Sequence, residues 1–138
     1  MNAKTGKELT LEWFERVWHN AEVTAISELM CQHCNVKGLD MDSSGPAGFI
    51  PLHSAFCSAF ESIRIEVLEM IEEEGVVMGH ARFIAVHKAT ERKVDFVFSF
   101  SARWKDGRMS EARNVVDYVA MLSQLGLFDQ HSMAKVFG

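Results

Sequence analysis

Strict alternation of apolar and polar residues between positions 94 and 104 constrains this chain more than any other feature. Every second position carries an aromatic or aliphatic side chain, and the positions between them are mostly polar. A period of two is typical of a β-strand, because successive side chains point to opposite faces of a sheet. Asp106 and Gly107 tolerate a left-handed backbone and therefore predict a turn after this strand, within residues 105–108. The apolar positions are Val94, Phe96, Phe98, Phe100, Ala102 and Trp104.

The second arm of the predicted hairpin, residues 109–117, is more polar than the first. Its polar side chains include Glu111, Arg113, Asn114 and Asp117. A phenylalanine stripe that faces a few carboxylate and amide groups has the usual composition of a small-molecule pocket. We therefore predict that Phe98 and Phe100 face a cavity. The side chains predicted to face the opposite side of the sheet are Ser99, Ser101 and Arg103.

Length and charge limit the class of protein. The chain has 138 residues, of which 48% are hydrophobic, and we expect one globular domain over residues 1–138, with a flexible lead (1–8) and a C-terminal tail (127–138). A net charge of −5 and a pI near 5.6 argue against a nucleic-acid partner, which would require a basic surface. No apolar run approaches a membrane span, so no membrane partner is expected. The N-terminus lacks a hydrophobic signal core, which favours a cytoplasmic protein.

The remaining periodicities predict helices first and strands afterwards. Apolar residues recur at helical spacing in the N-terminal part, and Gly45-Pro46 is typical of a helix start. From Ser62 onward the pattern alternates instead, which predicts four strands in series and an α+β fold with a curved antiparallel sheet over segregated helices. The predicted helices span residues 10–20, 22–30, 46–60 and 118–125, and a short strand is predicted at residues 36–41.

Two features of the helices have alternative interpretations. The first helix carries Trp13, Phe14 and Trp18, which either pack in the core or form the wall of a cavity. His53 lies on the apolar face of the third helix, where it is either a hydrogen-bonded core or rim histidine or a catalytic base.

Cysteine and histidine residues provide one pattern that resembles a metal site. Three cysteines in such a chain favour reduced thiols over a disulfide framework. A zinc site would combine Cys31, His33 and Cys34 with His53 and Cys57, but only one thiolate pair is close in sequence, and we expect no metal. A redox function for the CxxC motif is disfavoured as well, because the motif follows a predicted helix instead of preceding one.

Four short motifs together resemble the SnoaL-like polyketide cyclase family of the nuclear transport factor 2-like superfamily. One is the helix start at residues 45–49, GPAGF, and another is the DG turn with the glutamate that follows it. The others are NVVD at residues 114–117 and MLSQLG at residues 121–126. The resemblance covers most of the chain, and the paired N-terminal helices are also similar to those of the family.

The resemblance implies a cone-shaped, curved antiparallel sheet wrapped around the N-terminal helices. It further implies a cone that admits a small apolar molecule, a homodimer and chemistry without a cofactor. We expect the two copies to pair through the outer face of the sheet, where Val97 and Val115 add apolar area. The residues expected to line the cavity are Trp13, Phe14, Phe49, Phe56, Phe98, Phe100 and Asn114.

In the cyclases, an aspartate on the last strand acts as the acid/base group of an intramolecular ring closure. Counted from the DG turn, Asn114 occupies that position, and an amide cannot transfer a proton at neutral pH. The polar partners of the family aspartate correspond to Phe98 and Phe100. The remaining candidates for a base are therefore Asp117 and His53. Asp117 either reaches the cavity through a bulge or caps the helix that follows it.

Three function classes remain open from the sequence. The first is a cone that binds a small hydrophobic molecule of polyketide, steroid or terpenoid type. The second is a proton-transfer enzyme, such as a cyclase, isomerase, dehydratase or epoxide hydrolase, that uses Asp117 or His53 as general base. The third is a non-catalytic dimerisation or interaction domain.

Overall fold

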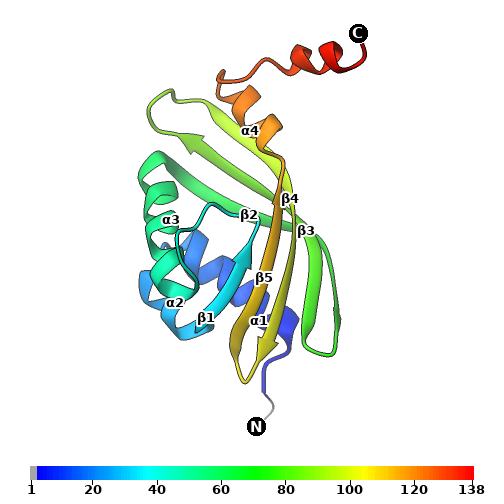
Figure 1. Ribbon diagram of the computed structural model, residues 1–138. Coiled ribbons are helices and arrows are strands. Elements are labelled where there is room, and N and C mark those ends of the chain that lie inside the picture. Colours follow the sequence, from blue (N-terminus) through cyan, green and yellow to red (C-terminus); the bar gives the residue numbers. More distant parts are fainter. Residues whose placement is uncertain (1–2) are drawn as a thin grey trace.

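The hairpin predicted at residues 94–117 lies at the centre of a curved sheet in the computed structural model, which describes residues 3–138 (Figure 1). The sheet has five strands in the order β1-β5-β4-β3-β2. The α+β fold class with a curved sheet is confirmed; β2 to β5 pair antiparallel as expected, and β1 pairs with β5 in parallel. The strands are β1 (Met30–Lys37), β2 (Phe60–Glu73), β3 (Val76–His87), β4 (Lys93–Lys105) and β5 (Arg108–Val116).

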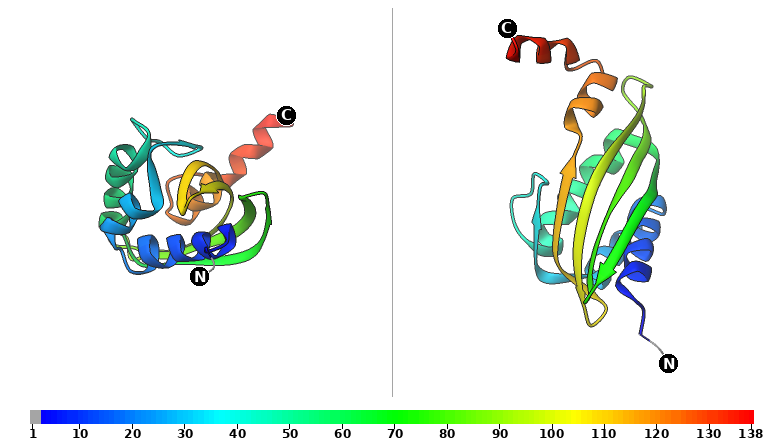
Figure 2. Two further views of the ribbon diagram at one scale, coloured as in Figure 1. Left: turned by 90° about the horizontal axis from the view of Figure 1, so that it is seen from below. Right: turned by 90° about the vertical axis from the view of Figure 1, so that its right-hand side faces the viewer.

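The N-terminal helices and α3 lie on one face of the sheet, and the sheet curves around them (Figures 1 and 2). The short helix α4 continues from the end of β5, and the C-terminal tail extends from it away from the rest of the chain (Figure 1). No helix within residues 3–138 is both long and apolar enough to cross a membrane. The helices are α1 (Gly6–Trp13), the π-helix η1 (Phe14–His19), α2 (Val23–Leu29), α3 (Gly45–Ala59), α4 (Tyr118–Gln124) and the 3-10 helix η2 (Gln130–Val136).

The first helix begins earlier than the sequence pattern predicted, because its N-terminus is capped twice. Thr5 and Glu8 form a capping box, in which each side chain accepts a hydrogen bond from the backbone N–H of the other residue. The carboxylate of Glu72 on β2 also accepts from the N–H groups of Gly6 and Lys7, at 2.9 and 3.0 Å. Residues 6–8, which the sequence pattern assigns to the N-terminal lead, are helical, while residues 1–2 lie outside the described part of the chain.

The predicted helix at residues 10–20 is not uniform. It changes at Phe14 into the π-helix η1, in which the N–H of Asn20 donates to the carbonyl of Glu15 at 2.9 Å. Leu9, Trp13 and Val17 are buried along one side, whereas Asn20 is exposed. The extra residue in the π turn rotates the end of the helix, so a fixed 3.6-residue period fails there.

The predicted strand at residues 36–41 is misplaced. The strand β1 begins at Met30, directly after α2, and therefore contains the whole CxxC motif. Only Met30 and Cys34 are buried in it, and its register with β5 shifts between Met30 and Asn35. The irregular register removes the alternation that identifies a strand in a sequence.

The central hairpin has the predicted turn and faces. Asp106 and Gly107 have φ values of 51° and 80°, the left-handed conformation that the sequence indicated. Phe98 and Phe100 are each 8% exposed and point into the fold, opposite Val116 and Asn114 on β5. The prediction for the other face is confirmed for Ser99 and Arg103, which alternate with the buried side chains, whereas Ser101 alternates in the same way but also borders the cavity.

Candidate functional site

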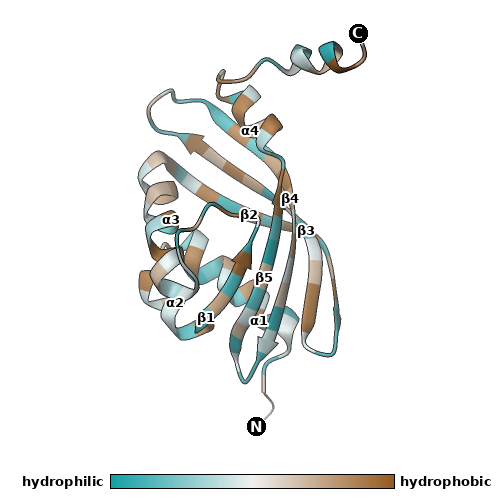
Figure 3. Ribbon diagram, in the orientation of Figure 1, coloured by the Kyte–Doolittle hydropathy of each residue, from teal (hydrophilic) through white to brown (hydrophobic). Residues whose placement is uncertain are grey.

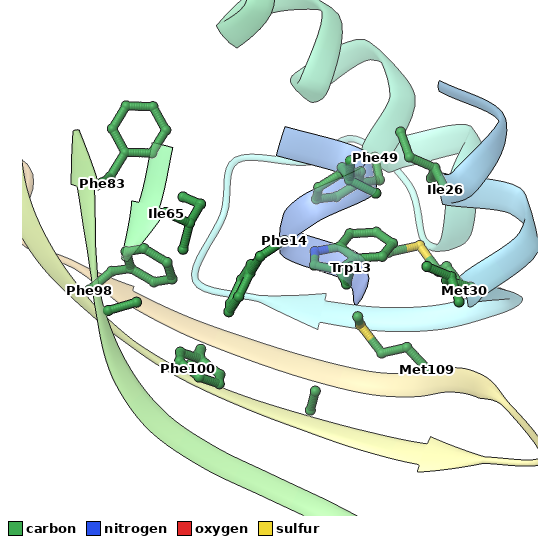
Figure 4. Close-up of a cluster of buried hydrophobic side chains, with 14 of the residues drawn as sticks. Trp13, Phe14, Ile26, Met30, Phe49, Ile65, Phe83, Phe98, Phe100 and Met109 are labelled. Carbon is green, nitrogen blue, oxygen red and sulfur yellow. The ribbon is translucent and has the colours of Figure 1, made fainter. Parts of the chain in front are cut away.

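A cavity of about 100 Å³ lies between the concave face of the sheet and the helices. Figure 4 shows part of its wall, where Phe98 and Phe100 project from β4 toward Phe14. All seven residues expected at the cavity lie on its wall, and so do Thr10, Trp18, Met30, Val36, Leu39, Leu52, Ile65, Phe83, Phe96, Ser101, Ala102, Trp104, Met109, Ala112, Val116, Tyr118 and Met121.

The π-helix brings the helical aromatic residues to one wall. The hydrogen bonds of a π-helix join residues five apart, and Trp13 and Trp18, which have this spacing, both line the cavity. Phe14 makes edge contacts with Phe100 and Phe98, at centroid distances of 5.3 and 6.2 Å. Edge-to-face packing of this kind is the favourable geometry for aromatic pairs, so the rings hold one another in place.

Three methionines, Met30, Met109 and Met121, make part of the wall adaptable. A volume of about 100 Å³ is smaller than the 300–1,000 Å³ of typical ligand pockets. Methionine has three rotatable bonds and repacks easily, so a ligand larger than a single ring can enter if these side chains change rotamer.

Two polar side chains on the wall, Thr10 and Trp104, are hydrogen-bonded to each other. Thr10 Oγ1 donates to the carbonyl of Gly6 at 2.8 Å and accepts from Trp104 Nε1 at 3.0 Å. Asn114 differs, because its side chain makes no hydrogen bond to any residue in the described part of the chain, although it lies on the wall. Its amide is therefore available to a ligand as both donor and acceptor.

Tyr118 is another polar group at the cavity, at the start of α4. Its hydroxyl lies 3.5 Å from the carbonyl of Gly38, at the limit of a hydrogen bond, and its side chain is 40% exposed. Burial raises the pKa of the Tyr118 hydroxyl, and the charge of Asp40 adds to this effect. The phenol therefore remains protonated at neutral pH and can donate a hydrogen bond.

Asp117 does not line the cavity. It is exposed at the N-cap of α4, where its carboxylate accepts from the N–H of Ala120 at 3.0 Å. Of the two interpretations considered for this residue, the helix cap is the one that the structure contains. The strand β5 ends at Val116 without a bulge near this residue that would turn the carboxylate inward.

His53 is 2% exposed and is bonded inside the core instead of lining the cavity. Its Nε2 lies 2.7 Å from the carbonyl oxygen of Val17 and therefore carries the proton. This carbonyl belongs to the end of η1, where helical N–H partners run out. His53 thus provides a hydrogen bond to a buried backbone carbonyl. Of its two interpretations, the hydrogen-bonded core histidine agrees with this arrangement, and the catalytic base does not.

The cysteines lie apart from the cavity wall. Burial raises the pKa of the Cys34 thiol to about 11, and burial also raises the pKa of Cys57. Cys57 Sγ lies 3.5 Å from His53 Nε2, whose proton already bonds Val17. Neither thiol has the lowered pKa that marks a reactive cysteine. Within residues 3–138, no three His, Cys, Asp or Glu side chains gather closely enough to hold a metal ion.

Sequence reasoning missed several wall residues, and the reasons differ. Trp104 lies on the same face of β4 as Phe98 and Phe100, so the strand alternation was sufficient to predict it as a wall residue. Trp18 was left open between the core and the cavity wall, and the structure, in which it follows the π turn, places it on the wall. Tyr118 depends on the direction in which α4 leaves the sheet, which no local signal in the sequence indicates.

Comparison with protein families agrees with the fold. Residues 8–125 match the family model described as SnoaL-like polyketide cyclase. No curated protein sequence matches the chain significantly.

Among solved structures, IdmH from Streptomyces antibioticus, a candidate polyketide cyclase, superposes with a TM-score of 0.78 at 17% identity, covering 89% of this chain and 99% of IdmH. AclR from Streptomyces galilaeus, a candidate hydroxylase, gives a TM-score of 0.79 at 21% identity and covers 90% and 97%. TsrD from Streptomyces laurentii gives 0.81 at 11% identity and covers 93% and 99%. At these identities the likeness establishes a shared fold only.

Proposed function

Because the chain belongs to the SnoaL-like polyketide cyclase family, whose model matches residues 8–125, we propose that its cone binds a small, neutral and mostly apolar molecule. The observation that carries this proposal is the composition of the wall. Aromatic and aliphatic side chains dominate it, and no Asp, Glu, His, Lys or Arg is among the described residues that line it. A molecule of polyketide, steroid or terpenoid type has matching chemistry.

The absence of charge from this wall favours a neutral ligand. An ion that enters the cavity would lose its hydration and would meet no opposite charge among the lining side chains, which is strongly unfavourable. A carbonyl or hydroxyl oxygen, in contrast, can accept from the amide of Asn114 or the hydroxyl of Tyr118. The ligand is therefore expected to have an apolar body and one oxygen-bearing end.

Binding is better supported than proton transfer. A ring closure or isomerisation needs a group that accepts a proton, and neither Asp117 nor His53 lines the cavity. Tyr118 is the titratable side chain on the wall, and its raised pKa suits a hydrogen-bond donor instead of a base. Asn114 and Tyr118 together can orient a ligand oxygen without reacting with it.

Calorimetric titration with a matched pair of compounds tests the proposal. Cyclohexyl methyl ketone and cyclohexanecarboxylate have the same ring, but only the second is charged. We expect the ketone to bind with a dissociation constant roughly tenfold lower or more, because the anion has no counterion in the cavity. Asn114→Leu and Tyr118→Phe should each weaken ketone binding by about 1 kcal/mol, the net value of one hydrogen bond.

The control variants are Asp117→Asn and His53→Gln, which retain shape and hydrogen bonding. Both should bind the ketone as the unmodified protein does. Equal or tighter binding of the carboxylate would contradict the proposal. Turnover of small ketones, enones or epoxides that is lost in either control variant would instead establish the proton-transfer function.

A further inference from the structure

Tyr118 lies where the cavity meets solvent. Among the described residues on the cavity wall it is the only exposed one, at 40%, and the others are buried or partly buried. Val116 and Met121, which flank it in the chain, are partly buried wall residues. At the opposite end of the β4–β5 hairpin, next to the turn, Trp104 and Met109 are only 7% and 4% exposed. The cavity therefore opens beside Tyr118.

The side chain of Tyr118 crosses this opening. It belongs to the first residue of α4, a helix that contains no buried residue although Figure 3 shows hydrophobic positions along it. The Tyr118 hydroxyl reaches the carbonyl oxygen of Gly38, the residue that follows β1. The aromatic ring therefore bridges α4 and the segment after β1, which are the two sides of the mouth.

The contact that holds the ring in this position is weak, whereas the side that accepts it is fixed. Gly38 has a φ of 85°, and a Cβ at this residue would lie 1.7 Å from the carbonyl oxygen of Asn114, so the chain passes directly against β5 here. The distance of 3.5 Å from the Tyr118 hydroxyl to Gly38 is at the limit of a hydrogen bond. Exposed side chains change rotamer within picoseconds to nanoseconds. The ring can thus leave Gly38 while that side of the mouth stays in place.

We propose that Tyr118 is the gate of the cavity and selects ligands by size. With its hydroxyl at Gly38 the ring closes the mouth next to Asn114, and rotation away from Gly38 opens it. A gate that is open for part of the time lowers the association rate constant in proportion to its open fraction. A large ligand enters only when the ring has rotated, whereas a small one also passes beside it. The hydrogen bond proposed above acts on the bound ligand, while the gate acts on entry.

Quenching of tryptophan fluorescence by succinimide tests the gate without any ligand. All three tryptophans of the chain line the cavity, and Trp13 and Trp104 are buried, so this bulky neutral quencher must pass the mouth to reach them. In Tyr118→Ala we expect the quenching rate constant to rise about twofold or more, because the ring no longer closes the mouth. Val119→Ala is the matched control. Val119 is 47% exposed on the same helix and does not line the cavity, so its substitution should leave quenching unchanged.

Stopped-flow mixing with two neutral ketones measures the selection by size, and this test rests on the proposed function. Tyr118→Ala should raise the association rate constant of dicyclohexyl ketone roughly tenfold and that of the smaller cyclohexyl methyl ketone by less. Tyr118→Phe keeps the ring and removes only the hydroxyl that holds it at Gly38. It should therefore give smaller increases in quenching and in both rate constants, and it provides the test if Tyr118→Ala does not fold.

The two measurements separate the gate from the proposed function. If neither ketone bound any of the proteins while Tyr118→Ala still increased quenching, the proposed ligand would be wrong and the gate would be correct. Quenching that is unchanged in both Tyr118 variants would overturn the gate, whether or not the ketones bind. An association rate constant that rises equally for both ketones, or that rises in Val119→Ala as well, would also overturn it.

Discussion

The side-chain amide of Gln124 hydrogen-bonds both backbone groups of Asp95. The Asp95 N–H donates to Gln124 Oε1 at 2.7 Å, and Gln124 Nε2 donates to the Asp95 carbonyl at 2.9 Å. The pairing of β5 with β4 stops at Phe98, so Asp95 has no strand partner on that side. Gln124 replaces the missing strand and thereby fixes α4, which holds Tyr118 at the cavity.

Substitution of Gln124 should loosen this helix. Gln124→Ala leaves the N–H and carbonyl of Asp95 without their partners, and we expect a loss of about 1–3 kcal/mol in the free energy of unfolding. Ser123→Ala is a control on the same helix. Among the described residues, Ser123 Oγ is buried without a hydrogen-bond partner, so its removal should be neutral or stabilising. Chemical denaturation measures both, and an equal loss in the two variants would contradict the role given to Gln124.

Asp117 should affect stability and not ligand binding. Asp117→Ala removes the cap of α4 and should lower stability by about 1 kcal/mol, whereas Asp117→Asn keeps an oxygen acceptor and should change it by only a few tenths. Thermal unfolding compares the two variants. If the Asp117→Asn variant were as unstable as Asp117→Ala, the charge of Asp117 would contribute more to stability than its hydrogen bond.

His53 should behave as a core hydrogen-bond donor. In His53→Leu the carbonyl of Val17 loses its partner in the core, and we expect a destabilisation of about 1–3 kcal/mol. Gln retains an N–H donor, so His53→Gln should recover part of that stability. Urea unfolding measures the free energy of unfolding of both variants. If His53→Leu and His53→Gln were equally stable, the hydrogen bond to Val17 would contribute nothing.

The ion pair of Asp95 and Arg82 should make part of the stability depend on pH. A hydrogen bond from Arg82 holds the pKa of the Asp95 carboxyl below its ordinary value of 3.8. A lowered folded-state pKa stabilises the protein above the ordinary pKa, and this contribution is lost as the pH falls through the folded value. The effect should be small, because both side chains are about one-third exposed.

Unfolding of Asp95→Asn and of the unmodified protein at several pH values measures this contribution. The unmodified protein should be the more stable near neutral pH, and the difference should shrink as the pH falls below the ordinary pKa of an aspartate and vanish below the folded-state pKa. Asp106→Asn, in the exposed turn, is the control and should show no such trend. A difference that persists in acid would exclude the ion pair as its cause.

The sequence predicted those parts of the structure that local pattern determines. The alternation from Val94 to Trp104 identified both faces of β4, and Asp106-Gly107 identified the turn. The beginning of β1 at Met30 could not be predicted, because this strand is held by parallel pairing with β5 and lacks a regular apolar alternation.

The cavity was predictable for residues on regular elements and less so elsewhere. Phe98 and Phe100 follow from strand alternation and Asn114 follows from the family resemblance, whereas Trp18 was left open between the core and the cavity wall. The positions of Asp117 and His53 were left between two interpretations. The hydrogen bond of Asp117 to Ala120 identifies Asp117 as a helix cap, and the hydrogen bond of His53 to Val17 identifies His53 as a core residue. The bond between His53 and Val17 joins segments that are far apart in the sequence.

Intrinsic fluorescence tests ligand binding in the cone most directly, because all three tryptophans of the chain, Trp13, Trp18 and Trp104, line the cavity. Titration with cyclohexyl methyl ketone should change the emission and saturate. In Ala112→Phe, which fills the cavity from β5, the dissociation constant should rise roughly tenfold or more, while Leu11→Phe on the exposed face of α1 should leave it unchanged. An unsaturable response, or the same dissociation constant in all three proteins, would show that the cone does not bind such a molecule.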